Sequence, residues 1–232
     1  WQLRQAPRTK HDTKVMTKNI GGSHGLYGSY SEATSATENF GTLASLAFRG
    51  SRGFPEKTSD SNILNPRINF AWNASGTSRF VFDIDFYQGR FGEPGGLALT
   101  RAAGVVSLEE GIEKTTLAND RFEFDRKAVV VTWDKDWSAR TGAKTSIWHS
   151  EARRASFRQA LGGATAFGGT AVGTTNSIQE QNFTTNGLDV RFIQKYDLNE
   201  SEQNFSIALT AIQTESPYSQ QTGASPFARS GT

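Results

Sequence analysis

The stretch that decides the fold spans residues 79 to 87 and reads Arg79-Phe80-Val81-Phe82-Asp83-Ile84-Asp85-Phe86-Tyr87. Apolar side chains occupy the even positions from 80 to 86, whereas charged side chains occupy three of the odd positions. Because successive side chains of a β-strand point to opposite faces, this alternation predicts a strand with one apolar face and one charged face.

Similar alternation recurs along the chain, and the connections between the alternating segments differ in length. We predict about nine strands, near residues 10–20, 26–36, 41–54, 63–73, 79–90, 121–137, 142–158, 183–197 and 204–214. Short turns are predicted near residues 38–39, 74–77, 138–141 and 199–202, and long connections near 50–62, 88–120, 159–181 and 214–232. Since every second connection is long, the long connections leave one end of the sheet, as the outer loops of outer-membrane barrels do.

This arrangement predicts an all-β, antiparallel up-and-down transmembrane barrel whose two faces have different surroundings. The residues predicted to face lipid are Phe80, Phe82, Ile84, Phe86, Leu188, Val190, Phe192, Phe205, Ile207 and Leu209. The residues predicted to face the lumen are Asp83, Asp85, Asp189, Arg191 and Lys195. Tryptophan and tyrosine collect at membrane interfaces, so we predict a periplasmic girdle of the aromatic residues beside short turns: Trp72, Trp133, Trp137 and Tyr196.

The composition narrows the classes of protein to which the chain can belong. Its 25 basic and 23 acidic residues give a net charge of +2, which is too even for a surface that neutralises nucleic-acid phosphates. The absence of cysteine excludes disulfides and thiolate chemistry. A mean hydropathy of −0.52 is compatible with a barrel, since only alternate strand residues contact lipid.

Three stretches resemble the TonB-dependent transporters, the siderophore-receptor type of outer-membrane barrel. Trp1–Pro7 resembles the junction from the plug into the barrel, and Gly22–Tyr30 resembles the first outer turn and second strand. Phe91–Leu97, followed by Leu99 and Thr100, resembles the stretch that opens a long outer loop after the fifth strand. The resemblance covers essentially the whole chain, which maps onto roughly the first nine of the family's 22 strands, the N-terminal part of the barrel.

The resemblance implies a domain organisation and a set of partners. Residues 1–7 are then the plug-to-barrel junction, and residues 8–232 are an incomplete barrel without its plug and remaining strands. The implied partners are outer-membrane lipid and lipopolysaccharide, TonB acting through the plug, and a small ferric chelate or another scarce nutrient. The implied location is the bacterial outer membrane, and neither a cofactor nor bond chemistry is expected.

One cluster, at the outer end of the seventh predicted strand, is a candidate ligand site: Trp148, His149, Arg153, Arg154 and Arg158. Guanidinium groups offer bidentate contacts to carboxylates, and aromatic neighbours offer stacking. We therefore predict contact with an anionic chelate. The alternative is that these arginines face lipopolysaccharide phosphates or acids of the loops.

Motifs that often carry catalysis are interpreted as structural. Gly21-Gly22-Ser23-His24-Gly25 fits the G-x-S-x-G pattern, but an alternating strand follows it instead of a helix. His149-Ser150-Glu151 lacks the cysteines of a zinc deaminase. Asp83 and Asp85 share a strand face at a spacing usable for metal binding or glycosidase chemistry, and we interpret them as lumen acids. No catalytic residue and no metal site are predicted.

Two alternatives remain open from the sequence. A soluble or surface β-sandwich or solenoid that binds carbohydrate or protein shows the same alternation, and it would bury Phe80, Phe82, Ile84 and Phe86 against other protein. A small autonomous outer-membrane barrel would need an even number of strands and closure within these residues.

Overall fold

The structure is a computed structural model that describes residues 12–53, 59–93, 99–102, 105–108, 120–159, 174–198 and 201–231. The predicted junction at residues 1–7 lies outside this described part, as do the centres of the predicted connections 88–120 and 159–181.

The described chain is built of β-strands, with no helix in these residues. The strands are β1 (Asp12–Gly21), β2 (Tyr27–Ala36), β3 (Phe40–Ser51), β4 (Ser61–Ser75), β5 (Ser78–Gly92), β6 (Leu99–Ala102), β7 (Val105–Leu108), β8 (Arg121–Asp136), β9 (Thr141–Gln159), β10 (Asn176–Leu198), β11 (Ser201–Glu215) and β12 (Tyr218–Gly223).

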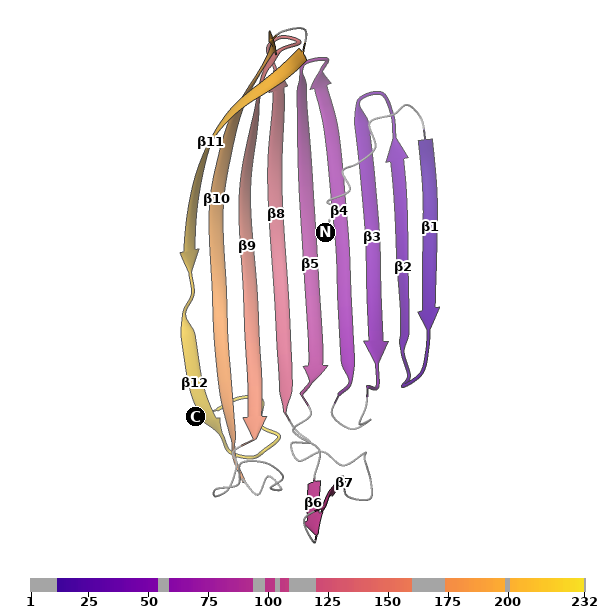
Figure 1. The fold of residues 1–232 in the computed structure, drawn as a ribbon, viewed down its shortest axis with the longest axis vertical. Helices are drawn as coiled ribbons and strands as arrows, with labels where there is room; N and C mark the ends of the chain where they lie inside the picture. Colours follow the sequence, from indigo (N-terminus) through magenta and orange to yellow (C-terminus); the bar gives the residue numbers. More distant parts are fainter. Residues whose placement is uncertain are drawn as a thin grey trace.

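One large antiparallel sheet contains all strands except β6 and β7, in the order β1-β2-β3-β4-β5-β8-β9-β10-β11, with β12 also paired to β10 (Figure 1). Each of the nine predicted strands corresponds to a strand of this ladder, so the up-and-down antiparallel prediction is confirmed. β6 and β7 form a separate two-stranded sheet within the long connection between β5 and β8.

The predicted bounds of the connections 159–181 and 214–232 are wrong, because both ranges include residues of strands. β10 begins at Asn176, and β12 continues the line of β11 in an unchanged register with β10, since Thr184 pairs with Glu215 and Gln181 pairs with Tyr218. Pro217, which has no N–H to donate to a ladder, lies in the gap between the two strands. The added segments have little apolar alternation, and backbone pairing alone extends them.

Long and short connections alternate between the two ends of the sheet (Figure 1). The connection of residues 22–26, on the long-connection end, is a tight turn in which His24 and Gly25 have φ values of 56° and 65°. The backbone N–H of Gly22 donates to the carbonyl of Leu26 at 3.0 Å. The G-x-S-x-G stretch is thus a turn between two strands, as the structural interpretation expected.

The cross-strand registers assign the side chains of the ladder to two faces, because residues opposite each other on neighbouring strands point the same way. All ten residues that were predicted to face lipid lie on one face, which we call the apolar face. All five residues that were predicted to face the lumen lie on the other, which we call the polar face.

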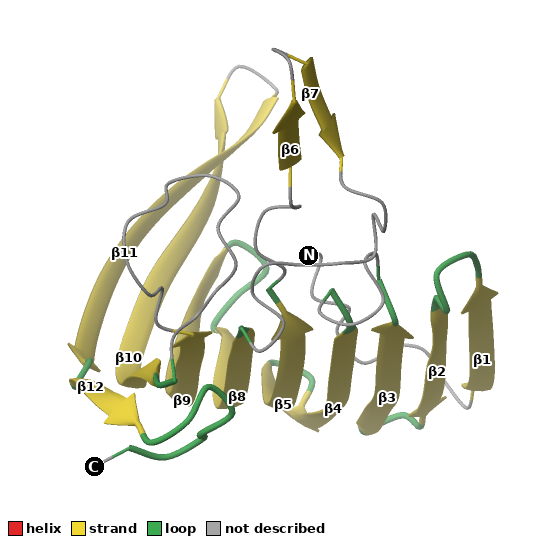
Figure 2. Ribbon diagram, turned by 90° about the horizontal axis from the view of Figure 1, so that it is seen from below, coloured by secondary structure: helices red, strands yellow, loops and turns green. Residues whose placement is uncertain are grey.

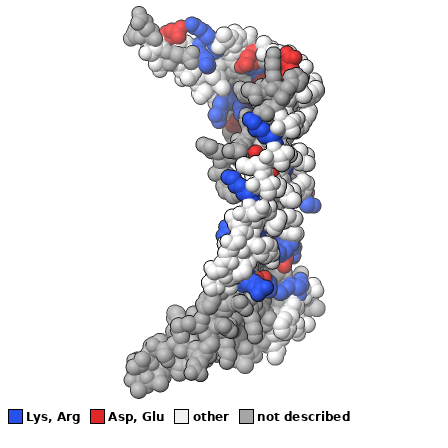
Figure 3. Space-filling view, turned by 90° about the vertical axis from the view of Figure 1, so that its right-hand side faces the viewer, with Lys and Arg blue, Asp and Glu red and all other residues white. Residues whose placement is uncertain are grey.

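The apolar face is the convex side of the curved sheet. Residues 224–231 lie against it, since Ala228 packs on Phe157 and Ile178, and the Arg229 guanidinium lies 4.6 Å from the centre of the Phe157 ring. Figure 2 shows this C-terminal segment on the outer side of the curve. Figure 3, an edge-on view from the β1 side, shows Lys and Arg side chains along the hollow side.

Large side chains of the apolar face are open to solvent. Phe82 is 37% exposed, Phe86 is 43% exposed and Leu209 is 71% exposed. A sandwich would cover such residues with a second sheet, but the described strands form only the ladder and the small β6–β7 sheet. The described residues therefore do not form the soluble sandwich, and they do not close into an autonomous barrel because β1 and β11 each end the ladder.

Candidate functional site

The apolar side chains of the convex face form a band that crosses the strands obliquely. The hydrogen-bonded row through Ile68 passes Ile84 and Val129, then leaves the band at polar residues. The rest of that row is His149, Asn186 and Gln213. The band is centred near Ile68 on β4 but near residue 208 on β11, whereas the row from Ile68 reaches β11 at Gln213. The centre of the band therefore shifts by about one residue per strand relative to the row. At ~3.4 Å per residue and ~4.8 Å between strands, this shift corresponds to an angle of about 35° between the band and the row. This is the strand tilt of membrane barrels.

Aromatic rings gather at the short-turn edge of the band. Trp72 and Trp133 stack on the two sides of Phe80, with ring centroids 5.6 Å and 6.2 Å apart. The ring centroids of Trp137 and Phe192 lie 6.1 Å apart. Tyr196, on the same face of β10, is 44% exposed. These positions suit the predicted periplasmic girdle, which stays a prediction.

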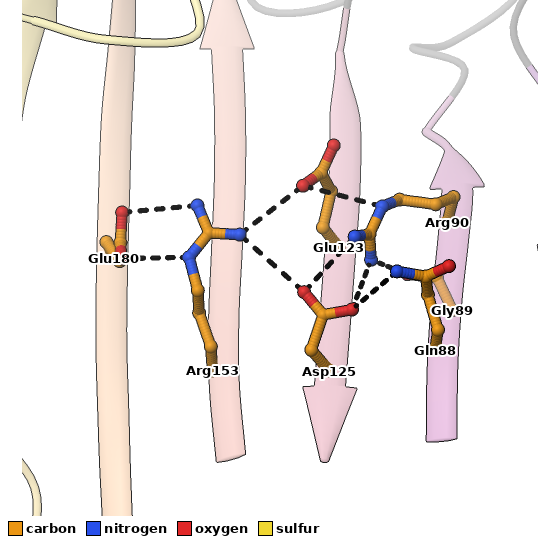
Figure 4. Close-up of polar contacts among 7 residues, drawn as sticks. All are labelled: Gln88, Gly89, Arg90, Glu123, Asp125, Arg153 and Glu180. Carbon is orange, nitrogen blue, oxygen red and sulfur yellow. Dashed lines mark hydrogen bonds and ion pairs between the residues drawn. The ribbon is translucent and has the colours of Figure 1, made fainter. Parts of the chain in front are cut away.

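At the long-connection edge of the band, the convex face carries a closed network of charges (Figure 4). Arg153 contacts Glu180 at 2.8 Å, Glu123 at 3.5 Å and Asp125 at 3.7 Å. Arg90 contacts Asp125 at 2.9 Å and Glu123 at 3.6 Å. Two guanidinium groups thus share three carboxylates across β5, β8, β9 and β10. Beside the network, a cavity of about 650 Å³ is lined by both charged and apolar residues at the edge of the band.

The acids of the polar face are paired at mid-height. Arg67 Nε donates to Asp83 at 3.0 Å, and Asn69 donates to the same carboxylate at 3.4 Å. Asp85 accepts from Asn65 at 2.8 Å and pairs with Arg126. Because β4 and β8 each supply an arginine to β5, the two acids link three strands by ion pairs. The described structure shows no role for these acids beyond this pairing.

The five residues of the predicted ligand cluster do not come together. Trp148, Arg154 and Arg158 lie on the concave polar face, whereas His149 and Arg153 lie on the convex face. His149 Nδ1 lies 2.8 Å from Asn186 Oδ1, at the edge of the apolar band. The period of two, which puts residues 148 and 149 on opposite faces, is the physical reason for the split.

Arg158 has intramolecular partners at the outer rim of the polar face. Its guanidinium contacts Glu93 at 2.8 Å and Asp120 at 3.9 Å. Asp120 is 2% exposed, and its carboxylate accepts the backbone N–H of Gln159 at 2.7 Å. Burial raises the pKa of Asp120, against the opposing effects of that N–H and of Arg158. The two acids flank the long connection between β5 and β8, so Arg158 fixes both of its ends to β9.

Between the Asp83 and Asp85 pairs and the long connections, the concave face carries an aromatic–arginine patch. We define this patch as Tyr87, Phe91, Phe122, Phe124 and Arg154. Tyr87 and Phe124 pack edge to face with centroids 5.8 Å apart, and Phe91 and Phe122 lie 6.2 Å apart. The Arg154 guanidinium lies 5.5 Å from the centre of the Phe122 ring. Four of these residues were not predicted as site residues, although the alternation of Phe122 and Phe124 could have indicated a shared face.

Gly89 gives the patch its floor. This glycine is buried on β5 between Tyr87 and Phe91, and a Cβ placed there would lie 2.7 Å from the Phe91 ring and 3.0 Å from the Tyr87 ring. The four aromatic side chains of the patch are half-buried, and Arg154 is exposed. The patch therefore offers ring surfaces and a cation to the hollow of the sheet.

Among the residues that the structure describes, no group of three or more His, Asp or Glu side chains is arranged to hold a metal ion. In the same part of the chain, no helix is long and apolar enough to cross a bilayer.

Comparison with solved structures identifies the fold. The ferric citrate transporter FecA, in its unliganded form, superposes with a TM-score of 0.72 at 14% identity, over 98% of this chain and 32% of FecA. BauA, the ferric preacinetobactin receptor from Acinetobacter baumannii, gives 0.58 at 10% identity, over 98% of this chain and 35% of BauA. No family model and no curated protein matches the sequence. The chain spans about a third of these structures and has the fold of an open part of such a β-barrel.

Proposed function

We propose that the chain forms part of the wall of an outer-membrane, TonB-dependent importer for a ferric chelate or a similar scarce nutrient. The oblique apolar band on the convex face carries this proposal. Between Leu64 and Trp72 on β4 the band measures about 22 Å along the membrane normal, taking ~3.4 Å per residue and a tilt of ~35°. Outer-membrane barrels have an apolar belt of about 25 Å.

The two edges of the band support the same placement. Aromatic rings lie at the short-turn edge, where an interfacial girdle belongs. The network of Arg90, Arg153 and their carboxylates lies at the long-connection edge, where headgroups and water can solvate charges. On this basis the short turns face the periplasm, and the ten convex residues contact lipid.

The residues of the concave side support a role in import and not only a structural role in the barrel wall. Its acids are neutralised at mid-height by Arg67 and Arg126, and the aromatic–arginine patch lies nearer to the outer loops. FecA and BauA, which share the fold, are the ferric citrate transporter and the ferric preacinetobactin receptor. A chelate entering from the outer loops meets the patch before it meets the ion pairs.

The membrane placement can be tested with single labels, because the chain has no cysteine. Leu209→Cys and Ala208→Cys put a spin label on adjacent residues of opposite faces of β11. We expect the label at position 209 to collide with oxygen dissolved in lipid, and the label at 208 to collide with a water-soluble nickel chelate. A label at 209 that is open to the nickel chelate contradicts the proposal.

Import can be tested separately in iron-limited cells that produce the full encoded protein. We expect uptake of a radioactive iron chelate that stops when a protonophore removes the energy supply of TonB. Uptake that is unaffected by the protonophore indicates a passive channel and contradicts the TonB-dependent part of the proposal.

A further inference from the structure

We infer that the aromatic–arginine patch is a binding site for an anionic ligand that carries planar conjugated rings, such as a catecholate chelate of iron. The inference rests on the proposed function, and it names both the class of substrate and the residues that select it. The residues come from three strands: Tyr87 and Phe91 from β5, Phe122 and Phe124 from β8, and Arg154 from β9.

Charge selects an anion at this end of the hollow. Arg49 and Arg154 are both exposed, and in the described part of the chain neither has a carboxylate within ion-pair distance. The arginines Arg126 and Arg158 of the same face are neutralised by Asp85, Glu93 and Asp120. Among the described residues, these two guanidinium groups therefore give this region a positive charge.

The register places these two cations on either side of the rings. Arg49 pairs with Ile63, Ile63 with Gly89, Gly89 with Phe124 and Phe124 with Arg154, so all five stand on one cross-strand row. At ~4.8 Å per strand the two arginines are about 19 Å apart. A ligand with several anionic rings can therefore contact both guanidinium groups.

The rings select a ligand that can stack. Aromatic pairs stabilise a contact beyond the area that they bury, and the face of an aromatic ring attracts a guanidinium group. Buried Gly89 keeps Tyr87 and Phe91 close without a side chain between them. An aliphatic chelate such as ferric citrate can use the arginines but gains little from the rings.

The test compares two probes on the full encoded protein in isolated membranes: the ferric tris-complex of 2,3-dihydroxybenzoate and ferric citrate. We expect the ring complex to bind more tightly. Phe122→Leu and Phe124→Leu should each weaken the ring complex about 3- to 10-fold, the equivalent of one aromatic contact, with less than a twofold change for citrate. Phe124→Tyr should keep the binding of the ring complex.

Charge is tested with matched variants of β9. Arg154→Gln should weaken both probes by about tenfold, as loss of a charge-assisted contact does, whereas His149→Gln on the convex face should change neither. Folding of each variant is checked by its resistance to unfolding in cold detergent.

Equal affinity of the two probes, or folded patch variants that bind both probes as the parent does, overturns the inference. A patch that instead holds another part of the protein is revealed if Phe124→Leu lowers stability without any change in affinity, which also overturns it. If energised iron uptake persists in all patch variants, the inference fails while the proposed function stands. If the cells take up no iron chelate at all, the proposed function itself fails.

Discussion

Phe82 and Asp83 are neighbours in the sequence, yet they lie on opposite faces of β5 and have opposite surroundings. Phe82 is left 37% exposed on the convex side, whereas Asp83 on the concave side is bound by Arg67 and Asn69. On the convex side the charged network begins only beyond the apolar band, and on the concave side charges stand at mid-height in pairs. Apolar exposure on one side and satisfied ions on the other are what the proposed placement requires, in which one layer of backbone separates lipid from water.

The largest expected effect tests the convex side of this comparison. Leu209→Arg puts a charge near the centre of the apolar band, where such substitutions cost about 2–4 kcal/mol in membrane barrels. The fraction of protein that folds into lipid vesicles, read by its shifted mobility in gels without heating, should fall sharply. Thr210→Arg on the concave face of the same strand, where residue 210 lies opposite Asp189, is the control and should assemble normally. Equal effects of the two variants remove the distinction between the faces.

A smaller effect is expected when a concave ion pair is opened. Arg67→Met leaves the largely buried Asp83 carboxylate with Asn69 as its one remaining partner among the described residues, at a cost of about 2 kcal/mol. The loss should appear as a lower urea midpoint for unfolding from detergent micelles. Replacing both partners, in Arg67→Met with Asp83→Leu, should recover most of the stability because no unpaired charge remains. A double variant that is as unstable as the single one argues against the pairing.

Packing across the concave face should have a still smaller effect. Gly187 lies opposite Trp148, and a Cβ at position 187 would overlap the indole. Gly187→Ala should cost about 1 kcal/mol, at the low end for overpacking, since the Trp148 indole is only half-buried. Gly76→Ala, whose Cβ would meet no atom within 4 Å, is the matched control. Equal thermal midpoints for the two variants show that the indole does not cover Gly187.

The smallest effect is expected at the exposed pair of Arg140 and Asp197, beside the short turns. Their side chains are 60% and 52% exposed, and exposed pairs contribute little. Arg140→Ala should change the unfolding free energy by less than about 0.5 kcal/mol in the same urea assay. A loss as large as that of Arg67→Met means that ion pairs of the sheet do not differ with burial.

Much of the fold could be predicted because a period of two and the spacing of turns are written in local sequence. Phe80, Phe82, Ile84 and Phe86 predict β5 and its faces without reference to any other strand. The same logic misses β12, because Pro217 and the polar residues around it read as a loop. Backbone pairing with β10 supplies what the side chains there do not signal.

The candidate site was harder to predict because it depends on register. Trp148, His149 and Arg154 were grouped by their closeness along the chain, although odd and even positions of one strand point apart. The patch brings Tyr87 of β5 against Phe124 of β8, and the long connection between these strands conceals their alignment. Turn lengths fix register only in short hairpins.

The obliqueness of the apolar band means that a hydrogen-bonded row is not a line of constant depth. Trp72 and Leu209 stand on one row, five strand steps apart. In the proposed membrane placement, at ~4.8 Å per step and a tilt of ~35°, their distances from the bilayer midplane differ by roughly 14 Å. In that placement, tryptophan lies where lipid meets water, and leucine lies among the acyl chains. A single row of the ladder then crosses about half of the membrane, and the residue type changes along it accordingly.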